Sequence, residues 1–183
     1  MTVKEVVLAT AEMVGVGDAV KIYLDGDKSQ GGKECSALLR CFNFIQNELA
    51  LDYFPLVAED VVSNLTGRIK YVQLSKAAVR ILSVKDETER SVQYKLFPSF
   101  LESQIGNLTV RYTYTPNEKT ISGEVEASLA VSMRLIAYGV AAEYCFSVGL
   151  YEEGEAWNKK YKDALAGAYT VQPAKVMRSR RWR

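Results

Sequence analysis

The chain closes on a run of residues that can bind acidic groups. Its last ten residues, AKVMRSRRWR, hold five positive charges and no acid. A guanidinium can hold a carboxylate or a phosphate through two parallel hydrogen bonds, and a tryptophan can anchor a protein contact once it is buried. The basic residues are Lys175, Arg178, Arg180, Arg181 and Arg183, and Trp182 lies between the last two.

The rest of the chain has the opposite sign. The protein has 23 Lys and Arg against 22 Asp and Glu, and without the five tail charges 18 basic residues remain against the same 22 acids. The body therefore carries −4 and the tail +5. A terminal run of one sign on a body of the other indicates an interaction segment. The alternative is a solvated chain end with no partner.

Residues that could perform catalysis are scarce. Histidine, the commonest general base and metal ligand, is absent. Cys35, Cys41 and Cys145 form no CxxC pair. The stretch GVGD at 15–18 lacks the rest of a phosphate loop, and DGD at 25–27 lacks the later glutamate of a calcium loop. We therefore expect no catalytic residues, no metal, no cofactor and no enzymatic activity.

Helical patterns dominate both ends of the chain. Residues 2–15 read as a short amphipathic helix, and residues 33–54 read as a longer helix that ends before Pro55. Residues 151–169 read as a last amphipathic helix, with Glu152, Glu153 and Glu155 near the positive end of its dipole. Residues 24–33 read as a loop.

Between these helices the hydrophobic period changes to two. Alternation predicts strands within 68–72, 91–97 and 107–116, and residues 79–84 form a further β-branched run. Short strands at this spacing indicate a small antiparallel sheet, a sandwich or an open barrel, which we place between about 56 and 116.

Residues 122–150 are apolar nearly all round and predict one long helix, capped by Ser122 or Gly123. Arg134 and Glu143 interrupt this stretch, and charges there would be costly in lipid, so we expect no membrane span. A helix that is apolar on two sides is expected to pack on its own core with one side and on another subunit with the other.

The predicted fold class is α+β. A helical bundle is expected from both chain ends, at 1–55 and 117–169, with a small antiparallel β domain inserted at 56–116. An extended basic tail is expected at 170–183.

This layout resembles the head-to-tail adaptor, or connector, proteins of tailed bacteriophages. The likeness lies in LLRCFNFIQNELALDYFPL, in the strands that end at NLTVRYTYTP, and above all in AYGVAAEYCFSVGLYEEGEAWNKKYKDAL before a basic, tryptophan-bearing end. It covers about residues 33–183. The β block is large for some members of that family, so it either decorates the ring or docks the next tail component.

The resemblance implies a structural virion protein, assembled in the bacterial host cytoplasm. It implies a homo-oligomeric ring, usually a dodecamer, under the portal protein. Genome DNA passes through the ring without sequence-specific binding, and a stopper, nozzle or tail tube lies beyond it. By position, the portal-docking residues are Lys175, Met177, Arg178, Arg180, Arg181, Trp182 and Arg183. Arg134, Trp157 and Tyr161 are weaker candidates for subunit contacts, and ordinary bundle packing explains them equally well.

Two alternatives stay open. The protein could be a stopper or tail-completion ring one level further from the head. It could also bind nucleic acid, with RSRRWR contacting phosphates and stacking on bases. The acidic body and the lack of a second basic patch in the sequence argue against nucleic-acid binding.

Overall fold

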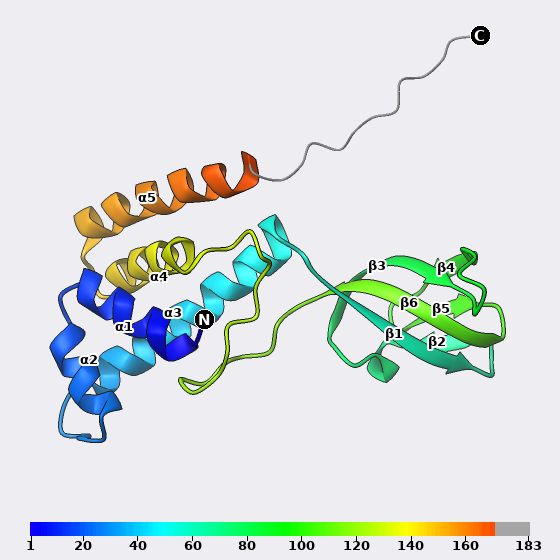
Figure 1. Cartoon of the computed structure of the whole chain (residues 1–183), viewed down its shortest axis with the longest axis horizontal. Coiled ribbons are helices and arrows are strands. Elements are labelled where there is room, and N and C mark those ends of the chain that lie inside the picture. Colours follow the sequence, from blue (N-terminus) through cyan, green and yellow to red (C-terminus); the bar gives the residue numbers. More distant parts are fainter. Residues whose placement is uncertain (171–183) are drawn as a thin grey trace, which may run out of the picture. The chain divides into compact units, whose positions relative to one another are not determined.

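The computed structural model describes residues 1–170 of the chain (Figure 1). These residues form a mixed α+β fold with five α-helices and two three-stranded antiparallel sheets. The helices are α1 (Val3–Met13), α2 (Gly17–Leu24), α3 (Gly32–Glu48), α4 (Met133–Ser147) and α5 (Tyr151–Thr170). The strands are β1 (Leu56–Asn64), β2 (Arg68–Lys70), β3 (Ala78–Lys85), β4 (Tyr94–Leu96), β5 (Phe100–Ser103) and β6 (Gly106–Tyr114). The predicted α+β class is confirmed, and the predicted tail from residue 171 on lies outside the described residues.

The described chain forms two compact units. The strand unit joins Met1–Lys4 to Leu39–Ser128, and the helical unit joins Glu5–Leu38 to the described residues after Ser128. All the strands of residues 1–170 lie between Leu56 and Tyr114. The division into domains at 55/56 and 116/117 stays a prediction.

One hydrophobic core is shared by the two sheets of the strand unit. The sheets have the strand orders β1-β6-β3 and β2-β5-β4. β1 and β6 pair along nine residues, from Leu56 opposite Tyr114 to Asn64 opposite Gly106. Side chains that point inward from both sheets are fully buried, because alternate residues of a strand face the same side. They are Ile69, Leu101, Leu108, Val110 and Tyr112.

Two strands and one helix were not predicted from the sequence. In β1, Glu59 and Asp60 interrupt the apolar pattern, and β5 has only four residues. Helix α2 occupies eight residues directly after the first helix. Helix α3 ends in a π-helical turn, η1 (Leu49–Tyr53), before Pro55, and a 3-10 turn, η2 (Tyr71–Gln73), follows β2.

The long helix predicted at 122–150 is wrong in its first third. Helix α4 begins only at Met133, and the Ser132 hydroxyl caps it by accepting a hydrogen bond from the Leu135 amide at 3.2 Å. The preceding residues bind other parts of the strand unit instead. The Val125 amide donates to the Met1 carbonyl at 3.2 Å, and the Glu126 amide donates to Gln46 Oε1 at 3.1 Å. These tertiary contacts outweigh the helical propensity of the segment.

Helices α4 and α5 form an antiparallel hairpin in the helical unit (Figure 1). Gly149 turns the chain with a positive φ of 84°. At Gly154 of α5, an added Cβ would lie 2.7 Å from the Phe146 ring of α4, so only glycine allows the helices this close an approach. Within residues 1–170, no helix is both long and apolar enough to cross a bilayer.

The expectation that α4 keeps one apolar face for another subunit is also wrong. Most side chains on both sides of α4 are buried within the chain itself, although Leu129 and Met133 of one predicted face are exposed. The buried side chains are Leu135, Ile136, Ala137, Val140, Ala141, Ala142, Tyr144 and Cys145. A subunit contact of the hairpin must therefore use other residues.

Candidate interaction surface

The three residues predicted for subunit contacts differ in how far the structure exposes them. Arg134 is exposed on the first turn of α4, and Trp157 is half-buried on α5. Tyr161 is only 5% exposed, which places it in the core. The predicted docking residues Lys175, Met177, Arg178, Arg180, Arg181, Trp182 and Arg183 lie outside the described residues.

Arg134 and Trp157 belong to one continuous stack of cations and rings. Arg134 Nε donates a 2.6 Å hydrogen bond to the Tyr138 hydroxyl, and its guanidinium carbon lies 5.2 Å from the centre of that ring. The Tyr138 and Trp157 ring centres are 5.6 Å apart at 35°. Lys160 Nζ lies 3.9 Å from the centre of the Trp157 ring. We call these four residues the cation–aromatic ladder.

Helical periodicity positions the ladder. Arg134 and Tyr138 are four residues apart on α4, and Trp157 and Lys160 are three apart on α5, so each pair shares one helix face. The antiparallel hairpin then brings the two aromatic rings together. Sequence analysis found Arg134 and Trp157 but missed Tyr138 and Lys160. The signal that would have found them is this i+4 and i+3 spacing.

An open groove of about 450 Å³ runs beside the ladder. Within the described part of the chain, neither Arg134 nor Lys160 has an acidic group within salt-bridge distance. Asp163 is the single acid on the groove wall, against two cations. The lining residues are Arg134, Tyr138, Lys160, Asp163 and Ala164.

This arrangement suits recognition of an acidic group. Contacts with the rings hold both cations in place before a partner arrives, and such contacts contribute about 0.5–1 kcal/mol each at exposed sites. Arginine, tyrosine and tryptophan are the residues that most often dominate protein interfaces.

The strand unit carries a polar cluster around Glu126. Glu126 Oε1 accepts hydrogen bonds from the Tyr114 hydroxyl at 2.7 Å and from Lys76 Nζ at 3.2 Å. Its other oxygen, Oε2, accepts one from Lys119 Nζ at 2.8 Å. Partial burial alone would raise the pKa of Glu126, but the hydrogen bonds from Lys119, Tyr114 and Lys76 outweigh it and lower the pKa to about 2.

The same cluster keeps Tyr114 protonated. Burial, the hydrogen bond to Glu126 and the charge of Glu126 raise the pKa of Tyr114 to about 12. Each oxygen of Glu126 is already engaged by a donor, so the cluster ties the segment after β6 to the strand unit. It is not arranged as an acid–base pair poised near neutral pH.

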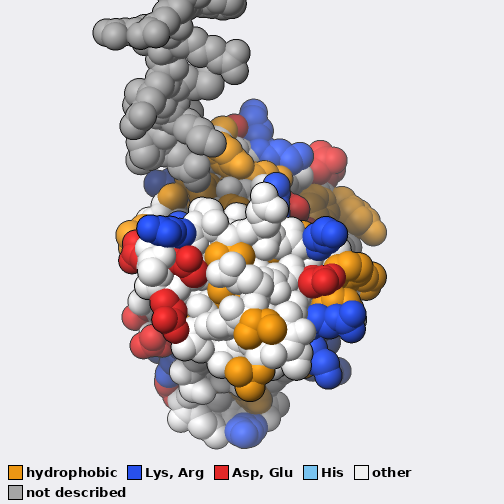
Figure 2. Space-filling view, turned by 90° about the vertical axis from the view of Figure 1, so that its right-hand side faces the viewer, with side chains coloured by type: hydrophobic (Ala, Val, Ile, Leu, Met, Phe, Trp, Pro, Cys, Tyr) orange, Lys and Arg blue, Asp and Glu red, His pale blue; other side chains and the backbone are white. Residues whose placement is uncertain are grey.

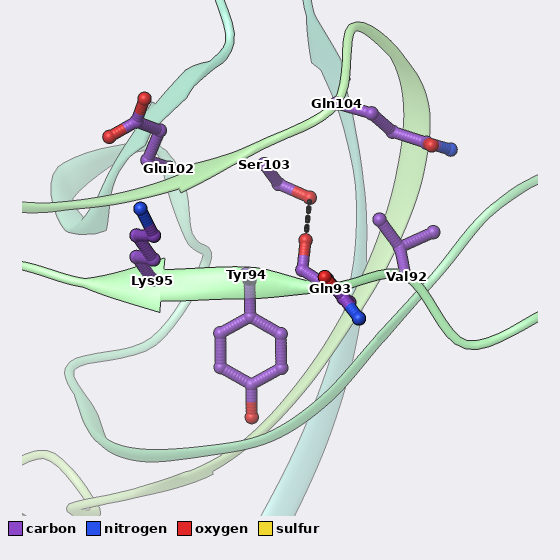
Figure 3. A pocket seen from close by; sticks show the side chains of 7 residues that line it. All are labelled: Val92, Gln93, Tyr94, Lys95, Glu102, Ser103 and Gln104. Carbon is purple, nitrogen blue, oxygen red and sulfur yellow. Dashed lines mark hydrogen bonds between the residues drawn. The ribbon is translucent and has the colours of Figure 1, made fainter.

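A second hollow, of about 560 Å³, opens beside the edge strand β4 (Figure 3). Lys95 and Glu102 face one another across β4 and β5, and Tyr94 points the other way. The Ser103 hydroxyl donates a 3.1 Å hydrogen bond to the Gln93 carbonyl, so it is not activated by a base. In residues 1–170, the acidic and cysteine side chains form no group that could hold a metal ion.

The face of the strand unit seen in Figure 2 has few charged side chains at its centre. Figure 2 shows separate hydrophobic side chains there among uncharged atoms, with most charged side chains toward the margins. Leu65 is 78% exposed and Ile105 is 68% exposed. They flank the last β1–β6 pair, Asn64 opposite Gly106. Both are among the most exposed apolar side chains of the strand unit.

Comparison with known proteins gives this chain no family. No protein-family model matches the sequence, and no curated protein matches it either.

Proposed function

We propose that the protein is a head-to-tail adaptor of a tailed bacteriophage. It forms a ring under the portal, links the capsid to the tail, and lines part of the DNA channel. In this proposal the helices from both ends of the chain make a bundle, and the strands form an inserted domain. The next tail component, a stopper, nozzle or tail tube, binds on the far side of the ring.

The main observation behind the proposal is that the tail and the body have opposite net charges, +5 and −4. Arginines and Trp182 provide bidentate pairing and an anchor, which suit a groove on an acidic protein partner. A ring presents many copies of the tail at once, so a weak single contact becomes strong through multivalency. A net acidic body beside DNA repels phosphate, which lets the duplex slide through a channel.

The surface of the α4–α5 hairpin is a second argument for assembly into a ring. The cation–aromatic ladder offers two cations and two rings without a described acidic partner. A surface of this composition fits a protein contact better than it fits a reaction. The resemblance in sequence to connector proteins points to the same kind of assembly.

The test is direct imaging of the purified protein mixed with its portal, with and without residues 174–183. We expect a ring on the portal only when these residues are present. Thermal unfolding of the truncated chain is the control, and we expect it to show a folded protein. Docking by the truncated chain would refute the role of the tail.

Nucleic-acid binding is the second candidate, and the composition of RSRRWR favours it. Phosphate contacts release counterions, so affinity for DNA would fall steeply as salt rises. Salt-sensitive DNA binding by the full chain, together with no complex with the portal, would replace the adaptor proposal with this one.

A further inference from the structure

We propose that the groove beside the cation–aromatic ladder of one copy receives the acidic tip of the α4–α5 hairpin of a second copy. The inference rests on the proposed function only in that it names the contact from which a ring would be built. The hairpin tip is defined here as residues 148–155.

The hairpin tip carries acids and exposed apolar side chains together. Val148 is 48% exposed, Leu150 is 43% exposed and Tyr151 is 68% exposed. Next to them Glu152 and Glu155 are exposed on the first turns of α5. Glu153 lies between them in the sequence. None of these three glutamates has a described cation within salt-bridge distance. The tip therefore offers negative charge beside apolar surface.

The groove has the complementary composition. Arg134 and Lys160 supply two cations, and Tyr138 supplies apolar ring surface on the groove wall. Trp157 packs on the Tyr138 ring beside the groove. Oppositely charged patches steer association and fix the register of a contact, while aromatic anchors provide most of its affinity. One partner thus matches the groove in both charge and apolar character, and this chain itself carries that partner.

The tip of a chain cannot fill its own groove. Glu152 and Lys160 are eight residues apart on the same helix, which separates them by about 12 Å along the axis at about 1.5 Å per residue. Glu155 is nearer, five residues or about 7.5 Å along the axis of α5 from Lys160, yet no glutamate of the tip lies within salt-bridge distance of Lys160 in the described structure. The contact must join different copies.

Groove and tip are different surfaces, so a single groove–tip contact leaves one tip and one groove unpaired. Association repeats in one direction until a ring closes or a filament grows, unless two copies pair both patches reciprocally. A two-fold dimer satisfies the same charge pairing, because each groove then meets the tip of the other copy. Species larger than a dimer in sedimentation distinguish a ring or a filament from it.

Two charge-reversed variants of the full chain test the inference. The groove variant is Arg134→Glu/Lys160→Glu, and the tip variant is Glu152→Lys/Glu155→Lys. All these side chains are exposed, so we expect folded proteins with the helical circular-dichroism signal of the native chain. Should the groove variant misfold, Arg134→Gln/Lys160→Gln removes the same charges more gently.

Sedimentation velocity at low salt, up to about 0.5 mM protein, detects even a contact with a Kd of about 1 mM. We expect the native chain to self-associate and each variant alone to do so at least about tenfold more weakly. An equimolar mixture of the two variants should associate again, because each acidic groove now meets a basic tip and each basic groove meets an acidic tip. The control Lys21→Glu/Lys70→Glu reverses two exposed cations elsewhere and should behave as the native chain.

A native chain that stays monomeric under these conditions would overturn the inference. Equally, folded variants that associate as the native chain does, or a mixture that stays monomeric, would overturn it. Portal docking distinguishes this failure from failure of the proposed function. If the full chain still docks on the portal through residues 174–183, the adaptor proposal stands and only the contact is wrong.

Discussion

The Tyr114 hydroxyl and the Glu126 carboxylate lie 2.7 Å apart and shift each other's pKa in opposite directions. The pKa of Glu126 falls to about 2, and that of Tyr114 rises to about 12. Both shifts favour the observed pair, a neutral phenol that donates to a charged carboxylate. The pair joins the end of β6 to the segment that leads toward α4.

Replacing Glu126 by Gln is expected to lower the free energy of unfolding by about 2 kcal/mol at pH 7, since three charged or hydroxyl donors lose their carboxylate. The folded pKa of Glu126 lies below its ordinary value of 4.5, so its contribution is complete above pH 4.5 and is lost as pH falls toward about 2. Urea unfolding of both proteins at several pH values should show the difference shrink over that range. Glu118, exposed in the same segment, supplies the control Glu118→Gln, which should change stability little at any of these pH values.

Replacing Tyr114 by Phe is expected to cost about 1 kcal/mol, because one partly buried hydrogen bond to a charged group is lost. The folded pKa of Tyr114 lies above its ordinary value of 10, so its contribution is complete below pH 10 and is lost as pH rises toward about 12. A double-mutant cycle with Glu126→Gln should show less than additive loss, since both substitutions remove the same contact. Strict additivity at pH 7 would mean that the pair does not interact in solution.

Replacing Gly154 by Ala is expected to destabilise the protein by about 1–3 kcal/mol, because the new methyl group would overlap the Phe146 ring. Gly167 lies on the same helix with open space where a Cβ would go. There the same substitution should stabilise by up to about 1 kcal/mol, since alanine favours the helix. Thermal unfolding of the two variants measures both effects, and equal shifts of the melting temperature would contradict the close approach of α4 and α5.

Replacing Tyr161 by Ala is expected to cost about 3 kcal/mol or more in stability, because a nearly buried ring leaves a cavity. Replacing Arg134 by Gln should cost less than about 1 kcal/mol, since its contacts are an exposed hydrogen bond and a ring contact. Chemical denaturation of both variants separates a core residue from a surface residue. A mild effect of Tyr161→Ala would restore Tyr161 as a candidate contact residue.

Hydrophobic periodicity predicted the elements in which buried side chains recur at a regular spacing. It missed those that are fixed by contacts with residues far away in the sequence. The stripe of Leu38, Phe42 and Ile45 predicts α3, and all three side chains are buried. No local pattern could show that Val125 and Glu126 hydrogen-bond to Met1 and Gln46, so the start of α4 was placed too early.

The candidate site shows the same limit. Arg134 and Trp157 stand out in the sequence by type, yet they are 23 positions apart. Their connection through Tyr138 exists only because the hairpin fixes the register of α4 against α5. Tyr161 shares the amphipathic face of α5 with Trp157, and sequence alone could not decide which of the two the core would bury.

The register of β1 against β6 has a consequence for how the chain tolerates rearrangement. Leu56 and Tyr114 are direct partners, so their Cα atoms lie about 5 Å apart although 57 residues separate them in the chain. The segment from Leu56 to Tyr114 therefore begins and ends at nearly the same place in the fold. A few glycines could span this distance without stretching the flanking chain. Such a linker would keep the two flanking backbone ends in place, but it would remove Tyr114 and Lys76, two of the three described side-chain donors to Glu126.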